Sequence, residues 1–182
     1  MYYRIKEIYD DNLYTDATVT NMNDVMPFNV TLPEKLGTNF PVLQLELDSD
    51  LRPNDFFKSG PFVIVPSKMK KILESVRADY EYFDVIITSD TATYSKGDFF
   101  FAHLLCGIDF LNKEESVYTP YESNDAFIER IEKVVIDEQK MDGAPAAMLK
   151  NCFEDVTVYQ SKLVDKMIQE SISGVEYEKL NH

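Results

Sequence analysis

The chain of 182 residues has few of the side chains that most often hold metals and phosphates: two histidines, two cysteines and six glycines. The histidines are His103 and His182, and Cys106 and Cys152 are not at the spacing of a zinc-binding pair, so a zinc site lacks its donors. The carboxylate pattern of a calcium loop is absent, and no cluster of glycines forms a phosphate-binding loop. We therefore predict no metal and no cofactor.

Basic residues are also scarce. Eighteen lysines and arginines stand against 32 aspartates and glutamates, which gives a formal net charge of −14. Such a field repels nucleic acid and anionic membranes and attracts cationic surfaces. We therefore predict neither a nucleic-acid partner nor a membrane partner. Two interpretations of the charge stay open: it keeps the protein soluble, or it matches a basic protein partner.

The sequence has neither a membrane-spanning run nor an export signal. Its longest nearly apolar run, residues 99–111, is too short for the roughly 20 residues that span a bilayer. The first residues alternate in polarity and do not form a signal peptide. We expect the protein in the cytoplasm, a reducing compartment, with Cys106 and Cys152 as free thiols.

Apolar residues are plentiful: 45% of the chain is hydrophobic, which suffices for one ordinary core. We predict a single domain, 1–182, of the α+β class, with a mixed or antiparallel sheet core, a duplicated strand-Ser-helix-strand unit and few peripheral helices. The predicted parts are the N-terminal strands and loop (1–50), the first repeat unit (60–88), the central core segment (97–116) and the second repeat unit (155–180).

The central core segment is mostly apolar. Between Phe99 and Leu111 only His103, Gly107 and Asp109 interrupt the apolar residues, so most sides of this run face protein. We favour a central strand that ends near Asp109. A buried strand that continues as a short helix is the alternative, because periodicity alone does not separate the two.

The polar residues in this run need partners, because a buried imidazole or carboxylate without a hydrogen bond costs several kcal/mol. For His103 two interpretations stay open: a neutral core histidine that donates to a backbone carbonyl, or a general base. For Asp109 we favour a carboxylate that accepts backbone N–H groups. Neither a helix nor a strand would bring His103 and Asp109 together as a catalytic dyad.

Two segments of the chain are alike. Residues 62–69 and 156–163 align without a gap, and each combines an apolar strand pattern, a serine and the start of an amphipathic helix. Ser67 and Ser161 stand where helix N-caps belong. Capping is favoured over nucleophilic catalysis, because a catalytic serine needs a nearby base and His103 is the only histidine inside the chain.

The remaining segments are less distinctive. Residues 2–9 predict a first strand followed by a turn at 10–12, residues 21–40 predict a long loop draped over the sheet, and residues 42–47 predict a strand by clean alternation. Asp55 is placed to cap a short helical turn. Residues 117–125 predict an exposed aromatic loop, and residues 127–136 fit a helix or a strand equally well.

One stretch resembles a known family. Behind the aromatic-aliphatic run stand Asp109, Asn112, Lys113, Glu114, Glu115 and Ser116, and this spacing resembles the signature of immunity protein family eleven of bacterial polymorphic toxin systems. The sequence departs from that signature where His103 replaces an asparagine and Asn112 an aspartate. Segments 53–56, 62–72 and 156–177 are also similar to the family pattern, so the resemblance covers about residues 40–180.

The residue arguments above predict a structural polar core, and the resemblance implies a function. The polar core residues are Asp55, Ser67, His103, Asp109, Ser116 and Ser161. Members of this family are implied to bind and neutralise a cognate toxin domain, so the expected function is occlusion of a toxin with a basic surface, without catalysis. The candidate partner-binding residues are Glu114, Glu115, Tyr118, Tyr121 and Glu122, because exposed tyrosines beside carboxylates suit an interface.

Two other hypotheses belong to different classes. The first is a small-molecule-binding protein or enzyme that uses His103 in a pocket. The second is a structural subunit that forms a homodimer through an exposed strand edge of the duplicated units.

Overall fold

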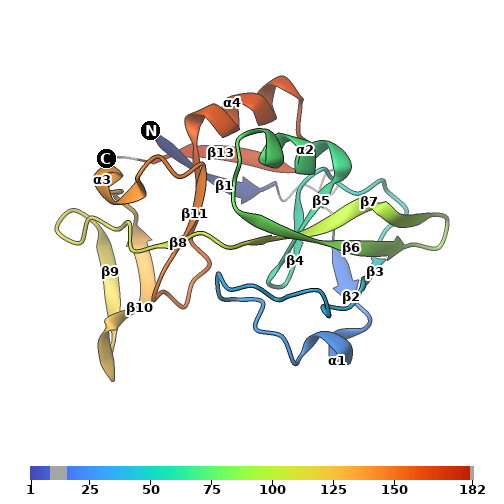
Figure 1. The fold of residues 1–182 in the computed structure, drawn as a ribbon, viewed down its shortest axis with the longest axis horizontal. Coiled ribbons are helices and arrows are strands. Elements are labelled where there is room, and N and C mark those ends of the chain that lie inside the picture. The colour runs from blue at the N-terminus through green and yellow to red at the C-terminus, as the bar shows by residue number, and fades with distance from the viewer. Residues whose placement is uncertain (9–15, 181–182) are drawn as a thin grey trace.

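The computed structural model describes residues 1–8 and 16–180. Its strands form a six-stranded sheet, a five-stranded sheet and a two-stranded hairpin (Figure 1). Both larger sheets mix parallel and antiparallel pairs, and the helices are few and short. The predicted α+β class with a mixed sheet core is confirmed. The turn expected at residues 10–12 lies outside the described residues.

The six-stranded sheet contains the first repeat unit and most of the central segment. Only its β3–β6 pair is parallel. The order of its strands is β2 (Ala17–Val19), β3 (Leu43–Leu47), β6 (Tyr80–Thr88), β7 (Thr93–Leu104), β5 (Phe62–Pro66) and β4 (Phe57–Ser59). In β3 the side chains of Leu43, Leu45 and Leu47 are buried and those between them are exposed, so the strand predicted from alternation over 42–47 is confirmed.

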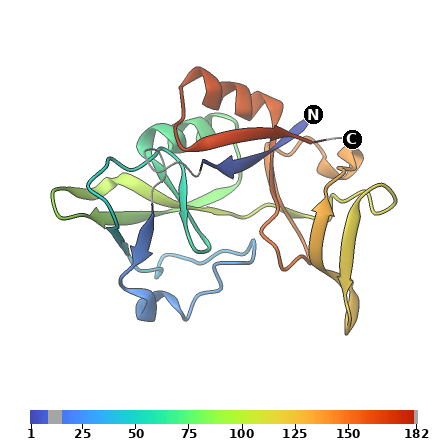
Figure 2. The same cartoon turned by 180° about the vertical axis from the view of Figure 1, so that it is seen from behind.

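The five-stranded sheet joins the two ends of the chain. Its strand order is β13 (Val175–Lys179), β1 (Tyr2–Glu7), β12 (Thr157–Gln160), β11 (Ala146–Leu149) and β8 (Gly107–Ile108). Seen from behind, β1 and β13 run side by side beneath the helix α4 (Ser161–Gln169) (Figure 2). The hairpin consists of β9 (Val117–Tyr121) and β10 (Asn124–Lys133), and the short helices α1 (Met22–Val25) and α3 (Glu138–Met141) lie in connecting segments.

The central segment connects the two sheets. It runs through β7, breaks at residues 105 and 106, and continues as β8 in the other sheet. The predicted end near Asp109 is correct, because β8 ends at Ile108. The run is not one strand, however, but the two strands β7 and β8. At the break, the Leu105 N–H donates to the Asp79 carbonyl, and Gly107 lies so close to Pro33 that an added Cβ would be 2.5 Å from its ring.

The two repeat units have the same element order and the same strand pairing. The first is β5, α2 (Ser67–Ser75) and β6, and the second is β12, α4 and β13. In each unit a third strand, β7 or β1, lies between the two unit strands and is antiparallel to both. Each helix therefore crosses over a strand that comes from elsewhere in the chain.

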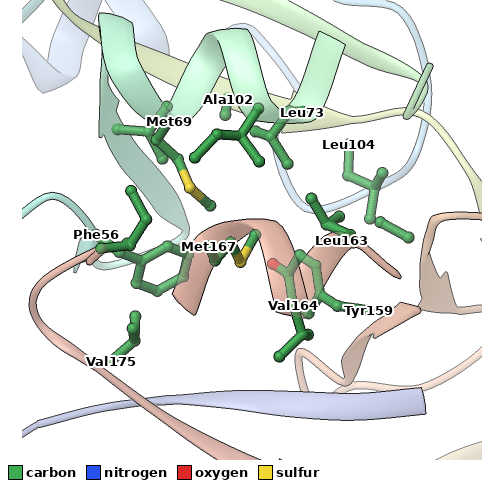
Figure 3. Close-up of a cluster of buried hydrophobic side chains, with 14 residues drawn as sticks. Phe56, Met69, Leu73, Ala102, Leu104, Tyr159, Leu163, Val164, Met167 and Val175 are labelled. Carbon is green, nitrogen blue, oxygen red and sulfur yellow. The ribbon is translucent and has the colours of Figure 1, made fainter. Parts of the chain in front are cut away.

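The helices of the two units pack against each other. Figure 3 shows Met69 and Leu73 of α2 pointing toward Leu163 and Met167 of α4. All four side chains are at most 1% exposed, and at about 25 cal/mol for each Å² of buried apolar surface they are a major source of stability. The same cluster takes in Ala102 of β7, so it joins both sheets through one core.

The serines at the two helix starts do not act as predicted. Ser67 and Ser161 are the first helical residues, after Pro66 and Gln160, and neither N-cap position carries a side-chain cap. The Ser67 hydroxyl donates to the Gly97 carbonyl, which ties α2 to β7. The N-cap interpretation was wrong for both serines, and for Ser67 the reason is that its hydroxyl bonds to a neighbouring strand instead.

A second correction concerns Asp55. No helical turn follows it; strand β4 begins two residues later. The buried Asp55 carboxylate accepts hydrogen bonds from the Lys68 ammonium at 2.8 Å and from the Ser173 N–H and hydroxyl at 3.1 and 3.2 Å. Burial raises the pKa of Asp55, but the Lys68 and Ser173 hydrogen bonds and the Lys68 charge outweigh it and hold the pKa below its usual value. Asp55 thus links both repeat units.

The long N-terminal loop covers the six-stranded sheet, as predicted. Phe40 is 7% exposed, and its ring lies 4.5 Å from that of Phe83 and 5.6 Å from that of Phe101, between ring centroids. The Phe28 ring packs edge-on against the Phe40 ring, with 5.1 Å between the ring centroids. The loop is held by aromatic packing, which favours such tilted contacts.

The close approach at Gly174 predicts a large loss of stability in Gly174→Ala. Gly174 has φ +84°, and a Cβ there would lie 2.5 Å from the Phe56 carbonyl oxygen. The backbone conformation costs about 1–2 kcal/mol for an L-residue, and the clash adds about 1–3 kcal/mol. Urea denaturation measures the sum. Gly37→Ala is the matched control, since φ is +81° with nothing within 4 Å; equal losses in both variants would contradict the clash.

The Asp55 contacts predict that Asp55→Asn lowers the free energy of unfolding by about 2 kcal/mol at pH 7, because hydrogen bonds to a charged group are lost. The folded-state pKa of Asp55 is depressed, so its contribution is complete above about pH 5 and disappears as pH falls through the lowered pKa. Denaturation curves at several pH values should therefore converge for the two proteins in acid. Asp109→Asn, at an exposed carboxylate, should cost less than about 0.5 kcal/mol.

Candidate functional site

The predicted partner-binding residues lie on and beside the β9–β10 hairpin. Glu114 and Glu115 precede β9, Glu122 is at the turn of the hairpin, and all three are exposed. Residues 109–142 contain ten acidic and four basic residues, so this end of the molecule is strongly negative. Glu114 and Glu115 lie before the start of β9 and Glu122 follows its end, so the structure places these glutamates at opposite ends of the strand.

The two tyrosines of the predicted set have different surroundings. Tyr121 is 40% exposed. Tyr118 is half-buried and packs against a second apolar cluster beneath the hairpin. The segment 117–125, expected as an exposed loop, instead forms β9 and the hairpin turn, and the open question over 127–136 is settled as strand by β10. Tyr121 is therefore the tyrosine available to a partner.

The turn before the hairpin is held by its own polar side chains. The Asn112 amide donates to the Glu115 carboxylate at 3.0 Å, and its oxygen accepts the Glu114 N–H at 3.2 Å. The Ser116 hydroxyl donates to the Val135 carbonyl at 3.2 Å and accepts the Val135 N–H at 3.0 Å. Ser116 thus has the structural role expected of it, and it fixes where the two glutamates stand.

Asp109 does not belong to a polar core. Its side chain is 48% exposed and pairs with Lys113 at 3.7 Å, where we expected a buried carboxylate bound to backbone N–H groups. The reason is that the chain leaves the sheet after Ile108. Asp109 consequently faces solvent.

An aromatic cluster beside the hairpin was missed from the sequence. The Phe153 ring lies 5.1 Å from the Tyr121 ring and 5.8 Å from the Phe127 ring, measured between ring centroids. Phe153 is 62% exposed, in the turn 150–155 between β11 and β12. Hydrogen bonds between the backbones of Ile128 and residues 151 and 153 hold this turn against β10. A lone phenylalanine in a polar turn was the signal that could have identified it.

A cleft of about 670 Å³ opens next to this cluster. Segment 30–34 of the N-terminal loop and the turn 150–155 both line it. Strands β5, β7 and β12 contribute Val63, Ala102 and Tyr159 to its wall. We call this hollow the central cleft. It is mostly apolar, and the exposed side chains of Leu32 and Phe153 both line it.

His103 lies in the wall of the central cleft but is only 2% exposed. Its Nε2 lies 2.8 Å from the Glu34 carbonyl oxygen, and since a carbonyl only accepts, this nitrogen carries the proton. Burial lowers the pKa of His103, although the Glu34 hydrogen bond and the Glu81 charge act in the opposite direction. The geometry matches the interpretation of a neutral core histidine, and His103 and Asp109 are not brought together.

The site offers no obvious place for an ion. Within residues 1–8 and 16–180, no three histidine, cysteine, aspartate or glutamate side chains gather closely enough to hold a metal. Over the same residues, no helix has the length and apolar character needed to cross a bilayer. Cys106 and Cys152 are both free thiols.

Comparison with known proteins gives one result. No curated protein matches the chain. The model of the Immunity protein family (Imm11) matches residues 21–182, which include both repeat units, the hairpin and the central cleft. A match over that share of the sequence means that the chain belongs to the Immunity protein family (Imm11).

Proposed function

We propose that this protein is an immunity protein that binds a cognate toxin domain in the cytoplasm and neutralises it by covering its surface, without catalysis. Membership of the Imm11 family supports the immunity role. The net charge of −14 supports a partner with a basic surface, because a toxin that acts on nucleic acid needs positive charge to hold phosphates. Complementary fields raise the rate at which such partners meet.

The observation that supports this binding face is the aromatic cluster of Tyr121, Phe127 and Phe153, which lies next to acidic side chains. Interfaces concentrate their binding energy in a few aromatic side chains, which surrounding polar residues shield from water. Here Glu122 adjoins Tyr121 at the hairpin turn. The glutamates steer the toxin, and the aromatic rings slow its release.

The alternative of an enzyme or small-molecule sensor that uses His103 has less support. The His103 Nε2–H donates its hydrogen bond to the Glu34 carbonyl, and the His103 side chain is only 2% exposed. Among the described residues no carboxylate is hydrogen-bonded to this imidazole. A general base needs access to the proton it removes, and this imidazole has no such access.

Charge reversal on the hairpin tests the proposal. In the double variant Glu114→Lys and Glu115→Lys, the association rate constant for the toxin domain should fall about tenfold at low salt, because steering is lost. The difference should shrink at high salt, where charges are screened beyond about 3 Å at 1 M. Stopped-flow mixing with the cognate toxin domain, in an inactive form, gives both values.

The control changes the net charge equally at another place. Asp48 and Asp90 are exposed and follow the ends of β3 and β6, and β6 points away from the hairpin (Figure 1). Asp48→Lys with Asp90→Lys should reduce the rate much less. If both double variants slow association equally, only overall charge matters and the hairpin is not the binding face.

A further inference from the structure

The central cleft and the aromatic cluster form one continuous surface. Phe153 lies at the edge of the central cleft and also contacts Tyr121 of the hairpin. Leu32, which also lines the central cleft, is 43% exposed. A contiguous apolar surface of this kind is typical of an interaction site.

The volume of the central cleft limits what could cover it. About 670 Å³ lies within the range of roughly 300–1,000 Å³ over which proteins enclose drug-sized ligands. That space is enough for a short segment that carries a few side chains. The wall contains Val63, Ala102 and Leu104, so the segment that fits it is apolar.

The charges around the central cleft favour a segment with basic neighbours. Glu34, Glu154, Asp155 and Lys150 line it. Asp155 is paired with Lys58 at 2.7 Å. The remaining charges that line the central cleft are two carboxylates, Glu34 and Glu154, and one ammonium, Lys150. No ion pair of Glu34 or Glu154 occurs within the described part of the chain. The excess is negative, as on the neighbouring hairpin.

We propose that the central cleft receives an apolar loop of the toxin domain that is flanked by basic residues. This inference rests on the proposed function and adds to it: the hairpin steers the toxin, and the central cleft holds it. The continuity of the cleft with the Tyr121, Phe127 and Phe153 cluster means that one partner reaches both. Burial of the loop between Leu32 and Phe153 then slows dissociation.

Aspartate substitutions separate apolar burial from simple charge attraction. Leu32→Asp and Phe153→Asp make the surface more acidic, so charge alone would tighten binding to a basic toxin. Loss of an apolar contact should instead weaken binding about tenfold or more, mainly through a faster dissociation rate. Both positions are exposed, so the variants should fold. The matched control is Ile168→Asp, at a side chain of α4 that is 55% exposed and outside the central cleft.

Thiol labelling gives a second, independent measurement on the wild-type protein. Cys152 lines the central cleft, whereas Cys106 does not, and both are free and half-buried. Alkylation with N-ethylmaleimide, followed by peptide mass spectrometry, should show loss of Cys152 labelling when the inactive toxin domain is bound. The labelling of Cys106 should stay unchanged.

The outcomes distinguish the two proposals. If the wild-type protein does not bind the toxin domain, both proposals fail. If it binds, but Leu32→Asp and Phe153→Asp behave like Ile168→Asp and Cys152 stays reactive, the central cleft is not the contact and only this inference is overturned. A dimer of the free protein that Leu32→Asp abolishes would assign the central cleft to a second copy of the chain and also overturn it.

Discussion

The packing of α2 against α4 is the contact on which the rest of the structure depends. Each helix belongs to a unit whose strands enclose a third strand from elsewhere in the chain, so neither sheet is complete without distant segments. Met69 and Met167 meet in the one cluster that both sheets share. The Asp55 carboxylate bonds to Lys68 of α2 and to Ser173 after α4. These hydrogen bonds fix the relative orientation of the two units, because apolar packing by itself is not directional.

This arrangement determines where the proposed binding surface lies. Once the two sheets are joined, the turn 150–155, segment 30–34 and Phe127 of the hairpin line one cleft. Two polar side chains of the central segment have structural partners: His103 bonds to the Glu34 carbonyl and Ser116 to the Val135 carbonyl. Apolar and acidic groups are left at the surface, which is a combination suited to binding a protein partner.

Predictions from sequence succeeded where the signal was local. Alternation identified β3, the serine and the amphipathic pattern located the starts of α2 and α4, and the spacing from Asp109 to Ser116 led to the family. Predictions failed where the partner lay far along the chain. Asp55 accepts a hydrogen bond from Ser173, 118 residues away, and Ser67 donates one to Gly97. The capping rule predicted bonds to neighbouring backbone groups for both residues, and it considers only such local partners.

The sequence by itself determined the excess of negative charge, the positions of the strongest apolar strands and the family, because composition, periodicity and motif spacing are properties of neighbouring residues. Only the tertiary structure decided that Asp109 faces solvent and that Tyr121, Phe127 and Phe153 form one cluster. It also decided that Leu32 and Phe153 line the same cleft. These residues belong to different strands, turns and loops, and they meet only because two sheets are held together by the helices between them.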